Sequence, residues 1–172
     1  MGIVINTEFH ELFATPLWIL KPELPEGAYE WALNIEQSYE SEKVSNRGGY
    51  QSPRLPMNDM PYKDHLLGQL DFFPEFHYDN YWVNINRKGD YNLKHTHPLS
   101  DFAVVWNITH NRNKLVIQNP LNHSRHKNND EKELNIKAGH ITVFPSDVPH
   151  YVEPHDLDIP RISVAFNITT TD

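Results

Sequence analysis

The sequence predicts a mainly β protein of the α+β class, built around an antiparallel sandwich or barrel. Apolar residues recur at helical spacing only in the first half of the chain, and beyond Tyr78 the apolar runs are short and separated by turn-forming residues. Helices followed by a series of strands are typical of an antiparallel sheet with helices packed on one face. With 172 residues and no repeat or linker-like stretch, one domain is expected over 1–172. Its N-terminal strand and helices would occupy 1–80 and its β-sandwich core 81–172.

The first eighty residues are expected to form one strand and two helices. Residues 13–20 are aromatic and branched with one proline, a pattern that suits an edge strand. An apolar stripe at helical spacing predicts a helix over 28–39, and a second short amphipathic helix is expected over 62–70. The stretch 46–53, with two adjacent glycines and a proline, is predicted to be a loop.

The rest of the chain is expected to be almost entirely β. Five runs rich in branched and aromatic residues are separated by turn-rich segments. These runs are residues 81–86, 103–108, 114–118, 141–144 and 162–168. The polar stretch 119–132, of mixed charge, is predicted to be a long exposed loop.

Composition narrows the possible partners and the possible kinds of site. Fifteen Lys and Arg against 23 Asp and Glu give a formal charge of −8, which disfavours nucleic acid and anionic lipid as partners. Because no apolar stretch could span a bilayer and the N-terminus has no signal-like segment, we expect a cytoplasmic protein without membrane association. The chain has no cysteine, so a metal site would use histidine and carboxylate ligands.

Three of the eleven histidines occupy positions that suit a metal site. His95 and His97 are two residues apart, so in an extended segment they project from the same face. Their Cα atoms would then be about 7 Å apart, close enough for two imidazoles to converge on one ion. His150 follows a predicted strand and a turn, which makes it a candidate third ligand. A His-x-His pair alone is more often an ordinary polar strand face.

The last predicted strand carries a second candidate site. Alternation puts its polar and small residues on one face and its branched and aromatic residues on the other. The apolar face, which begins at Ile162, demands burial, whereas the face with Arg161 and Ser163 meets solvent or lines a pocket. A guanidinium with a hydroxyl two residues further on is a suitable receptor for a carboxylate.

Two further residues are candidates for the same pocket. Asn84 shares a predicted strand face with Trp82 and Asn86. A buried amide needs hydrogen-bond partners, which a bound molecule or a neighbouring strand would supply equally well. Tyr91 lies shortly before His95 and is a candidate for contact with a bound molecule.

Taken together, these segments resemble the 2-oxoglutarate- and Fe(II)-dependent oxygenases, in particular a small uncharacterised group near the prolyl hydroxylases. The specific part of the resemblance consists of three motifs in order. They are His-Thr-His-Pro (95–98), Phe-Pro-Ser (144–146) with His150 four residues further on, and Arg-x-Ser (161–163). The matching segments occur in the family's order, cover most of the chain beyond residue 80 and match more loosely before it. They are residues 46–52, 81–92, 95–98, 139–150 and 161–167.

The resemblance implies a fold and a metal site. The fold is a double-stranded β-helix, or jelly roll, with the N-terminal helices packed on one sheet. By correspondence, His95, His97 and His150 are the metal ligands at its open end, and His97 stands where the family usually has an acidic residue.

The resemblance also implies a co-substrate and a reaction. Arg161, assisted by Ser163, would hold the distal carboxylate of 2-oxoglutarate, and Asn84 and Tyr91 are the other candidates for contact with this co-substrate. The implied cofactors are Fe(II), 2-oxoglutarate and O2. The implied reaction hydroxylates a peptidyl or small-molecule C–H bond and releases succinate and CO2.

A histidine at position 97 leaves both iron and zinc as candidates for the metal. The standard non-haem iron site has two histidines and one carboxylate, whereas three histidines and a water are a familiar zinc arrangement. Asp101 is close enough in sequence to be a neighbouring partner or the missing carboxylate. The alternatives are a cupin-like three-histidine metalloenzyme that does not use 2-oxoglutarate and a non-catalytic jelly-roll binding module. The sequence specifies neither the substrate nor the oligomeric state.

Overall fold

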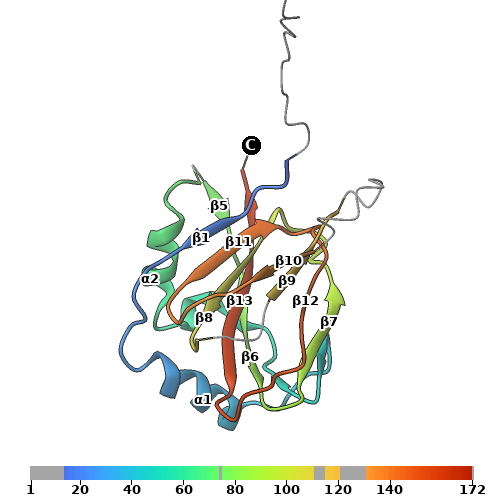
Figure 1. Ribbon diagram of the computed structural model, residues 1–172. Coiled ribbons are helices and arrows are strands. Elements are labelled where there is room, and N and C mark those ends of the chain that lie inside the picture. Colours follow the sequence, from blue (N-terminus) through green and yellow to red (C-terminus); the bar gives the residue numbers. More distant parts are fainter. Residues whose placement is uncertain (1–13, 74, 111–114, 121–130, 172) are drawn as a thin grey trace, which may run out of the picture.

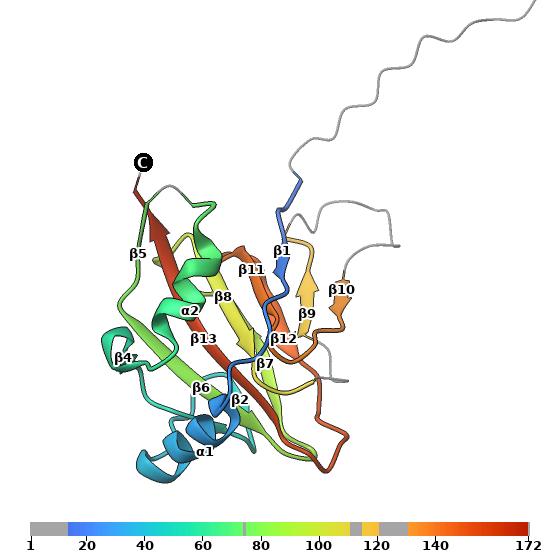
Figure 2. The same cartoon turned by 90° about the vertical axis from the view of Figure 1, so that its left-hand side faces the viewer.

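The computed structural model describes residues 14–73, 75–110, 115–120 and 131–171. Within these residues the strands form two antiparallel sheets, one of eight strands and one of five. Figures 1 and 2 show that helices α1 (Ala28–Ser38) and α2 (Lys63–Leu67) cover one side of the larger sheet, and the smaller sheet lies on its other side. The architecture is the predicted jelly roll with helices on one sheet.

The larger sheet has the order β1-β11-β8-β13-β6-β3, with β4 paired to β6 and β5 paired to β13. Its strands are β1 (Trp18–Leu20), β3 (Tyr50–Gln51), β4 (Leu55–Pro56), β5 (Phe76–His77), β6 (Asn80–Asn86), β8 (Phe102–Asn107), β11 (Ile141–Pro145) and β13 (Arg161–Thr170). Because β13 pairs with β6 and β8 on its two sides, its alternation determines which residues of these neighbours share each face.

The smaller sheet has the order β10-β9-β12-β7-β2. Its strands are β2 (Asn46–Arg47), β7 (Tyr91–His95), β9 (Leu115–Gln118), β10 (Glu131–Leu134) and β12 (His150–Val152). Two short 3-10 helices, η1 (Met57–Asp59) and η2 (Gly68–Leu70), complete the described elements.

The core has two layers, one on each face of the larger sheet. On the outer face, which we define as the face toward the helices, Trp106 and Phe166 are fully buried in a cluster that includes Ala32 of α1. On the inner face, which points toward the smaller sheet, Phe144 packs in a second cluster with Val152. The inner layer also contains the polar residues of the site.

The helices predicted in the N-terminal half are present. The helix expected over 28–39 is α1, and the one expected over 62–70 is α2 followed by η2. α1 begins after Gly27, whose φ is +78° and whose missing Cβ would lie 3.2 Å from Tyr62 Oη, so a side chain there would be strained and crowded. Of the strand expected over 13–20, the described part forms a paired strand only at 18–20.

Two loop predictions need correction. Residues 46–53 contain the strands β2 and β3, which pair with β7 and β6; two-residue pairings depend on distant partners and leave little local pattern. The stretch 119–132 ends in β10, which pairs with β9, and its residues 121–130 lie outside the described residues. The five predicted strand runs correspond to β6, β8, β9, β11 and β13, with Lys114 outside the described part.

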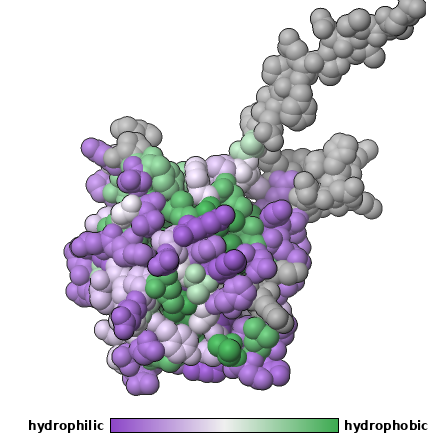
Figure 3. All heavy atoms as spheres, turned by 60° about the vertical axis from the view of Figure 1, so that its left-hand side comes forward, coloured by the Kyte–Doolittle hydropathy of each residue, from purple (hydrophilic) through white to green (hydrophobic). Residues whose placement is uncertain are grey.

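One side of the molecule is mostly polar (Figure 3). The side of the molecule shown in Figure 3 is largely hydrophilic, with smaller apolar areas between the polar side chains. None of the helices in the described ranges has the length and apolar character needed to cross a membrane.

Candidate functional site

Three short elements bring the predicted histidines to one point between the sheets. β7 ends at His95, the next loop carries His97, and β12 begins at His150. His95 and His150 are paired neighbours on adjacent strands. His97 lies beyond the end of β7, and its backbone N–H donates to Ser146 O at 2.8 Å. The loop that carries His97 is thus tied to the turn that precedes His150.

A β-bulge in β7 determines which of its side chains face the cavity. Val152 is opposite Asn92 and His150 is opposite His95, so three steps along β7 match two along β12. The extra residue lets Asn92 and His95 both line the cavity between the sheets. Tyr91, the candidate for contact with the co-substrate, is not among the lining residues, whereas its neighbour Asn92 is.

The candidate ligand atoms of the three imidazoles lie within 4.8 Å of one another. The Nε2 atoms of His97 and His150 are 3.1 Å apart, and the ring centroid of His95 is 5.0 Å from that of His97 and 4.4 Å from that of His150. Two nitrogens that are each about 2.1 Å from one ion, at roughly a right angle, are separated by about 3.0 Å. The spacing of His97 and His150 therefore fits two neighbouring positions on one metal ion.

Hydrogen bonds to backbone carbonyls orient two of the rings. His95 Nδ1 lies 2.7 Å from Leu93 O, and His150 Nδ1 lies 3.0 Å from Val148 O. A carbonyl oxygen only accepts, so Nδ1 carries the hydrogen in both rings and each Nε2 keeps its lone pair. Metal-bound histidines commonly make this contact through the nitrogen that does not bind the metal. Both rings are therefore oriented to bind an ion through Nε2.

Burial keeps the imidazoles neutral at neutral pH. Desolvation, with repulsion from His95, lowers the pKa of His97 to about 4 and the pKa of His150 to about 3. Desolvation also lowers the pKa of His95, against the opposing effect of its hydrogen bond to Leu93. Neutral imidazole is the form that binds metal, so no proton has to leave before an ion enters.

Arg161 lies on the inner face at the start of β13 and makes no ion pair within the described residues. It is 2% exposed, its Nη1 donates to Ser163 Oγ at 3.1 Å, and its Nε has no acceptor. Burial lowers the pKa of Arg161 to about 10, which leaves the guanidinium charged at neutral pH. A buried cation without a counter-ion is costly. This end of the cavity is therefore suited to an anion, and its planar donor geometry fits a carboxylate.

One cavity between the sheets joins the histidines to this arginine. Its free volume is about 40 Å³, so a molecule much larger than a water enters only if wall side chains move. Asn84 and Ser163, both predicted site residues, are on its wall. The full lining is Ser45, Trp82, Asn84, Asn92, His95, His97, Val105, Leu115, His150, Val152, Arg161, Ser163 and Ala165.

A chain of polar side chains at the cavity was not anticipated from the sequence. Asn86 Nδ2 donates to Asn92 Oδ1 at 2.9 Å, and Asn92 Nδ2 donates to Ser45 Oγ at 3.2 Å. The chain links β6, β7 and the segment before β2. Nothing in the local pattern of Ser45 or Asn92 indicates this contact, because it depends on the register of β2 against β7.

Asp101 does not supply a carboxylate to the histidines. Its Oδ2 accepts hydrogen bonds from the backbone N–H and the hydroxyl of Thr170, at 2.8 and 2.9 Å. Within the described ranges, the group of side chains that could hold a metal ion consists of His95, His97 and His150 alone. The role suggested for Asp101 as the missing ligand is therefore not supported, and its carboxylate anchors the end of β13.

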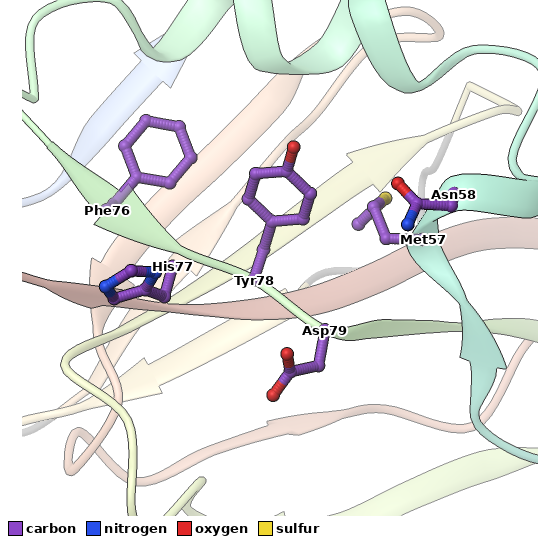
Figure 4. Close-up of a pocket in the computed structure, with 6 residues that line it drawn as sticks. All are labelled: Met57, Asn58, Phe76, His77, Tyr78 and Asp79. Carbon is purple, nitrogen blue, oxygen red and sulfur yellow. The ribbon is translucent and has the colours of Figure 1, made fainter.

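A second cavity, of about 410 Å³, lies away from the histidines and is lined by Met57, Asn58 and residues 76–79. Figure 4 shows Phe76 and Tyr78 on one side of the chain segment and His77 and Asp79 on the other. This alternation is that of an extended segment, and it separates His77 and Asp79 from the Phe76 and Tyr78 rings (Figure 4). The cavity contains none of the predicted site residues.

The fold and the site together define a jelly-roll protein with three converging imidazoles and a buried, unpaired arginine. The family model described as "Putative 2OG-Fe(II) oxygenase" matches residues 80–167, about half of the chain. The protein belongs to this family, and it is a 2-oxoglutarate- and Fe(II)-dependent oxygenase, as the motifs predicted. No curated protein sequence matches the chain.

Solved structures of oxygenases share this fold at low sequence identity. A prolyl-4-hydroxylase of Pseudomonas putida matches with a TM-score of 0.65 and 15% identity, over 91% of this chain and 93% of that one. A prolyl hydroxylase from Trichoplax adhaerens, in complex with a hypoxia inducible factor peptide fragment, matches with a TM-score of 0.67 and 12% identity, over 90% and 83%. HygX from Streptomyces hygroscopicus, with nickel, 2-oxoglutarate and hygromycin B bound, matches with a TM-score of 0.69 and 8% identity, over 91% and 84%.

Proposed function

We propose that His95, His97 and His150 hold the iron of this oxygenase, and that Arg161 and Ser163 hold the distal carboxylate of 2-oxoglutarate. The observation that carries the proposal is one cavity lined both by three imidazoles with converging nitrogens and by a buried guanidinium without a counter-ion. Bound Fe(II), with 2-oxoglutarate and O2, supplies the oxidation of an unreactive C–H bond to C–OH, while 2-oxoglutarate becomes succinate and CO2. The substrate is a peptidyl side chain or a small molecule.

The protein's part is to bind and orient. Arg161 and Ser163 hold one end of the co-substrate from β13, and Asn84, which is opposite Ser163 in the sheet, adds an amide beside it. The carbonyls of Leu93 and Val148 fix the imidazole planes. The apolar layer around Phe144 and Val152 excludes water from the same space.

His97 changes the charge of the site. Three neutral imidazoles leave the charge of a divalent ion uncompensated, whereas the usual carboxylate cancels one unit. A 2-oxoglutarate dianion balances the ion, and the guanidinium of Arg161 then leaves a net positive charge in the cavity. We therefore expect the site to bind anions more strongly than one with a carboxylate ligand.

The test is binding and turnover with Fe(II) added to metal-free protein without a histidine tag. Anaerobic Fe(II) with 2-oxoglutarate should give a weak visible charge-transfer band, and admission of air should give succinate. Arg161→Ala should abolish 2-oxoglutarate binding but leave Fe(II) binding, and Arg47→Ala, at an exposed arginine of β2, is the matched control. A wild-type protein with neither band nor succinate contradicts the proposal.

The same measurements separate the alternatives. A cupin-like enzyme would keep its metal-dependent activity in Arg161→Ala, because it needs no distal carboxylate contact. A binding module would be purified without stoichiometric metal. Reconstitution with Zn(II) in place of Fe(II) should give a folded, metal-bound protein that forms no succinate, since zinc has no redox chemistry.

A further inference from the structure

A second arginine lies beside the site, outside the cavity lining. Arg54 is exposed and sits on the short bridge between β3 and β4, both of which pair with β6. The bridge is fixed by the buried Ser52, which donates its N–H to Val83 O and accepts the Val83 N–H at its Oγ, both at 2.9 Å. The backbone therefore presents Arg54 from a defined position, and the long side chain stays free to move.

One aromatic ring, that of Trp82, lies between Arg54 and the histidines of the proposed metal site. Its Cζ lies 6.0 Å from the centroid of the Trp82 ring, within cation–π range. The Trp82 ring in turn stacks on His97, with centroids 5.5 Å apart and planes at 23°. The positive charge of Arg54 also contributes to the lowered pKa of His97, which is consistent with this proximity.

Among the residues that the structure describes, Arg54 has no anionic partner, although the protein is acidic overall. Among the arginines in the described ranges, it alone lacks a polar acceptor. Arg87 makes two 2.7 Å contacts with Glu36, Arg47 donates to backbone carbonyls, and Arg161 donates to Ser163. An unpaired guanidinium over an indole beside a cavity is a suitable receptor for a carboxylate from solution.

The guanidiniums of Arg54 and Arg161 are at different places along the site, Arg161 on the cavity wall and Arg54 outside it. Trp82 is opposite Ala165 in the pairing of β6 with β13, and Ala165 is four residues from Arg161, roughly 13 Å along the strand. Arg161 is buried and Arg54 is exposed. A single small dianion such as 2-oxoglutarate that is held at Arg161 thus leaves Arg54 for a different anion.

We propose that Arg54 binds a carboxylate of the primary substrate at the Trp82 side of the site. The substrate class is then an acid: a small carboxylic acid, or a peptide whose carboxylate lies near the oxidised carbon. This proposal rests on the proposed function, because it takes Arg161 to be occupied by 2-oxoglutarate and the three histidines by iron. The net positive charge of a three-imidazole site with bound co-substrate favours the same class of substrate.

The first test compares matched acids and amides. N-acetyl derivatives of the neutral amino acids, each as free acid and as primary amide, are assayed for stimulation of succinate formation. We expect stimulation by acids and not by their amides. Arg54→Gln should raise the KM for a stimulating acid about tenfold, the loss of one charge-assisted contact, and Arg54→Lys should raise it less. Arg47→Gln, the matched control at an exposed arginine away from Trp82, should change it by less than about twofold.

The second test needs no turnover. In the diamagnetic Zn(II)–2-oxoglutarate protein, the Nε–H resonance of Arg54, identified by its loss in Arg54→Lys, is followed during titration with N-acetylglycine and with its amide. A shift with the acid alone supports the proposal, even when no compound of the panel stimulates turnover. Amides that stimulate as well as acids, or an Arg54 resonance that N-acetylglycine leaves unchanged, overturn it.

The two proposals fail separately. If the wild-type protein does not bind 2-oxoglutarate, the proposed function fails. The titration of the Arg54 resonance is then repeated on metal-free protein, where a shift with N-acetylglycine still supports a carboxylate receptor at Arg54 and its absence overturns one.

Discussion

The two faces of the larger sheet differ in how completely their side chains are satisfied. On the outer face, Val164 and Phe166 of β13 are fully buried under the helices. On the inner face, the same strand carries Arg161 and Ser163. One ten-residue strand therefore contributes packing on one side and polar groups on the other.

The unsatisfied polar atoms follow this division. In the described strands, the outer face of the larger sheet has one buried polar side-chain atom without a partner, Trp106 Nε1. The inner face has more: Gln51 Oε1, Asn86 Oδ1, Thr142 Oγ1, Arg161 Nε and Asn167 Oδ1. Because buried polar groups without partners cost stability, the inner face is stabilised less than its burial suggests. Stability therefore comes mainly from the outer face of the larger sheet, and ligand binding from the inner one.

The largest expected effect is a loss of outer-face packing. Phe166→Ala should lower the free energy of unfolding by about 3–5 kcal/mol, because it removes a fully buried ring from a closely packed layer. Urea unfolding of the metal-free protein measures this. Since Phe166 faces away from the cavity, the Phe166→Ala protein that remains folded should bind 2-oxoglutarate and Fe(II) like the wild type. A loss below about 1 kcal/mol would contradict the assignment of stability to this face.

The next effect has the opposite sign and lies on the inner face. Arg161→Met keeps the apolar length of the side chain and removes a buried charge without a counter-ion, so it should raise the free energy of unfolding of the ligand-free protein by about 1–3 kcal/mol. It should also remove the stabilisation that 2-oxoglutarate gives the Fe(II)-loaded wild type. Denaturant unfolding with and without co-substrate measures both. A less stable variant that still responds to 2-oxoglutarate would refute this account of Arg161.

Alternation along β13 could be predicted because it is local. A strand with one buried face must place its apolar residues at every second position, so the sequence alone predicts Arg161 and Ser163 on one side and Ile162 on the other. The expected helices followed from periodicity in the same way. The approach of His150 to His95 could not be derived from spacing, because it depends on the pairing of β12 with β7; the resemblance to a family supplied it.

Other features are invisible in the sequence for physical reasons. The bulge in β7 inserts one residue between Asn92 and His95, and a bulge depends on the register of the partner strand. Plain alternation would group Tyr91 with His95, whereas the structure lines the cavity with Asn92. Arg54 likewise belongs to no recognisable sequence motif. Its position near the histidines becomes visible only in the structure, where β6 places Trp82 between Arg54 and His97.

Acid should lower the free energy of unfolding through the imidazoles that line the cavity. The pKa of His97 is lowered to about 4 and that of His150 to about 3, so between roughly pH 6.5 and 4 the unfolded chain binds protons that the folded protein does not. The contribution of these two histidines to the free energy of unfolding is therefore fully present above about pH 6.5. It decreases as the pH falls, by up to about 1.4 kcal/mol per pH unit for each histidine.

Urea unfolding of metal-free protein at several pH values between 7.5 and 4.5 checks this slope. Carboxylates and other histidines titrate in the same range, so the comparison is with His97→Asn, which lacks one of the depressed groups. The variant should lose less stability than the wild type between pH 6.5 and 5. Parallel pH profiles would mean that His97 is not the neutral, desolvated group described above.

The smallest expected effect concerns a buried polar atom that lacks a partner but does not line the cavity. Thr142 is fully buried on β11, opposite Val105, and its Oγ1 has no partner; unlike Arg161, it does not line the cavity. Thr142→Val keeps the shape and removes the hydroxyl, so the free energy of unfolding should rise by less than about 1 kcal/mol, with unchanged affinity for 2-oxoglutarate. Thermal and urea unfolding, with a co-substrate titration, measure both quantities. A variant that gains stability but loses co-substrate affinity would show that Thr142 belongs to the binding site, and the division of the inner face between structural and ligand-binding groups would have to be redrawn.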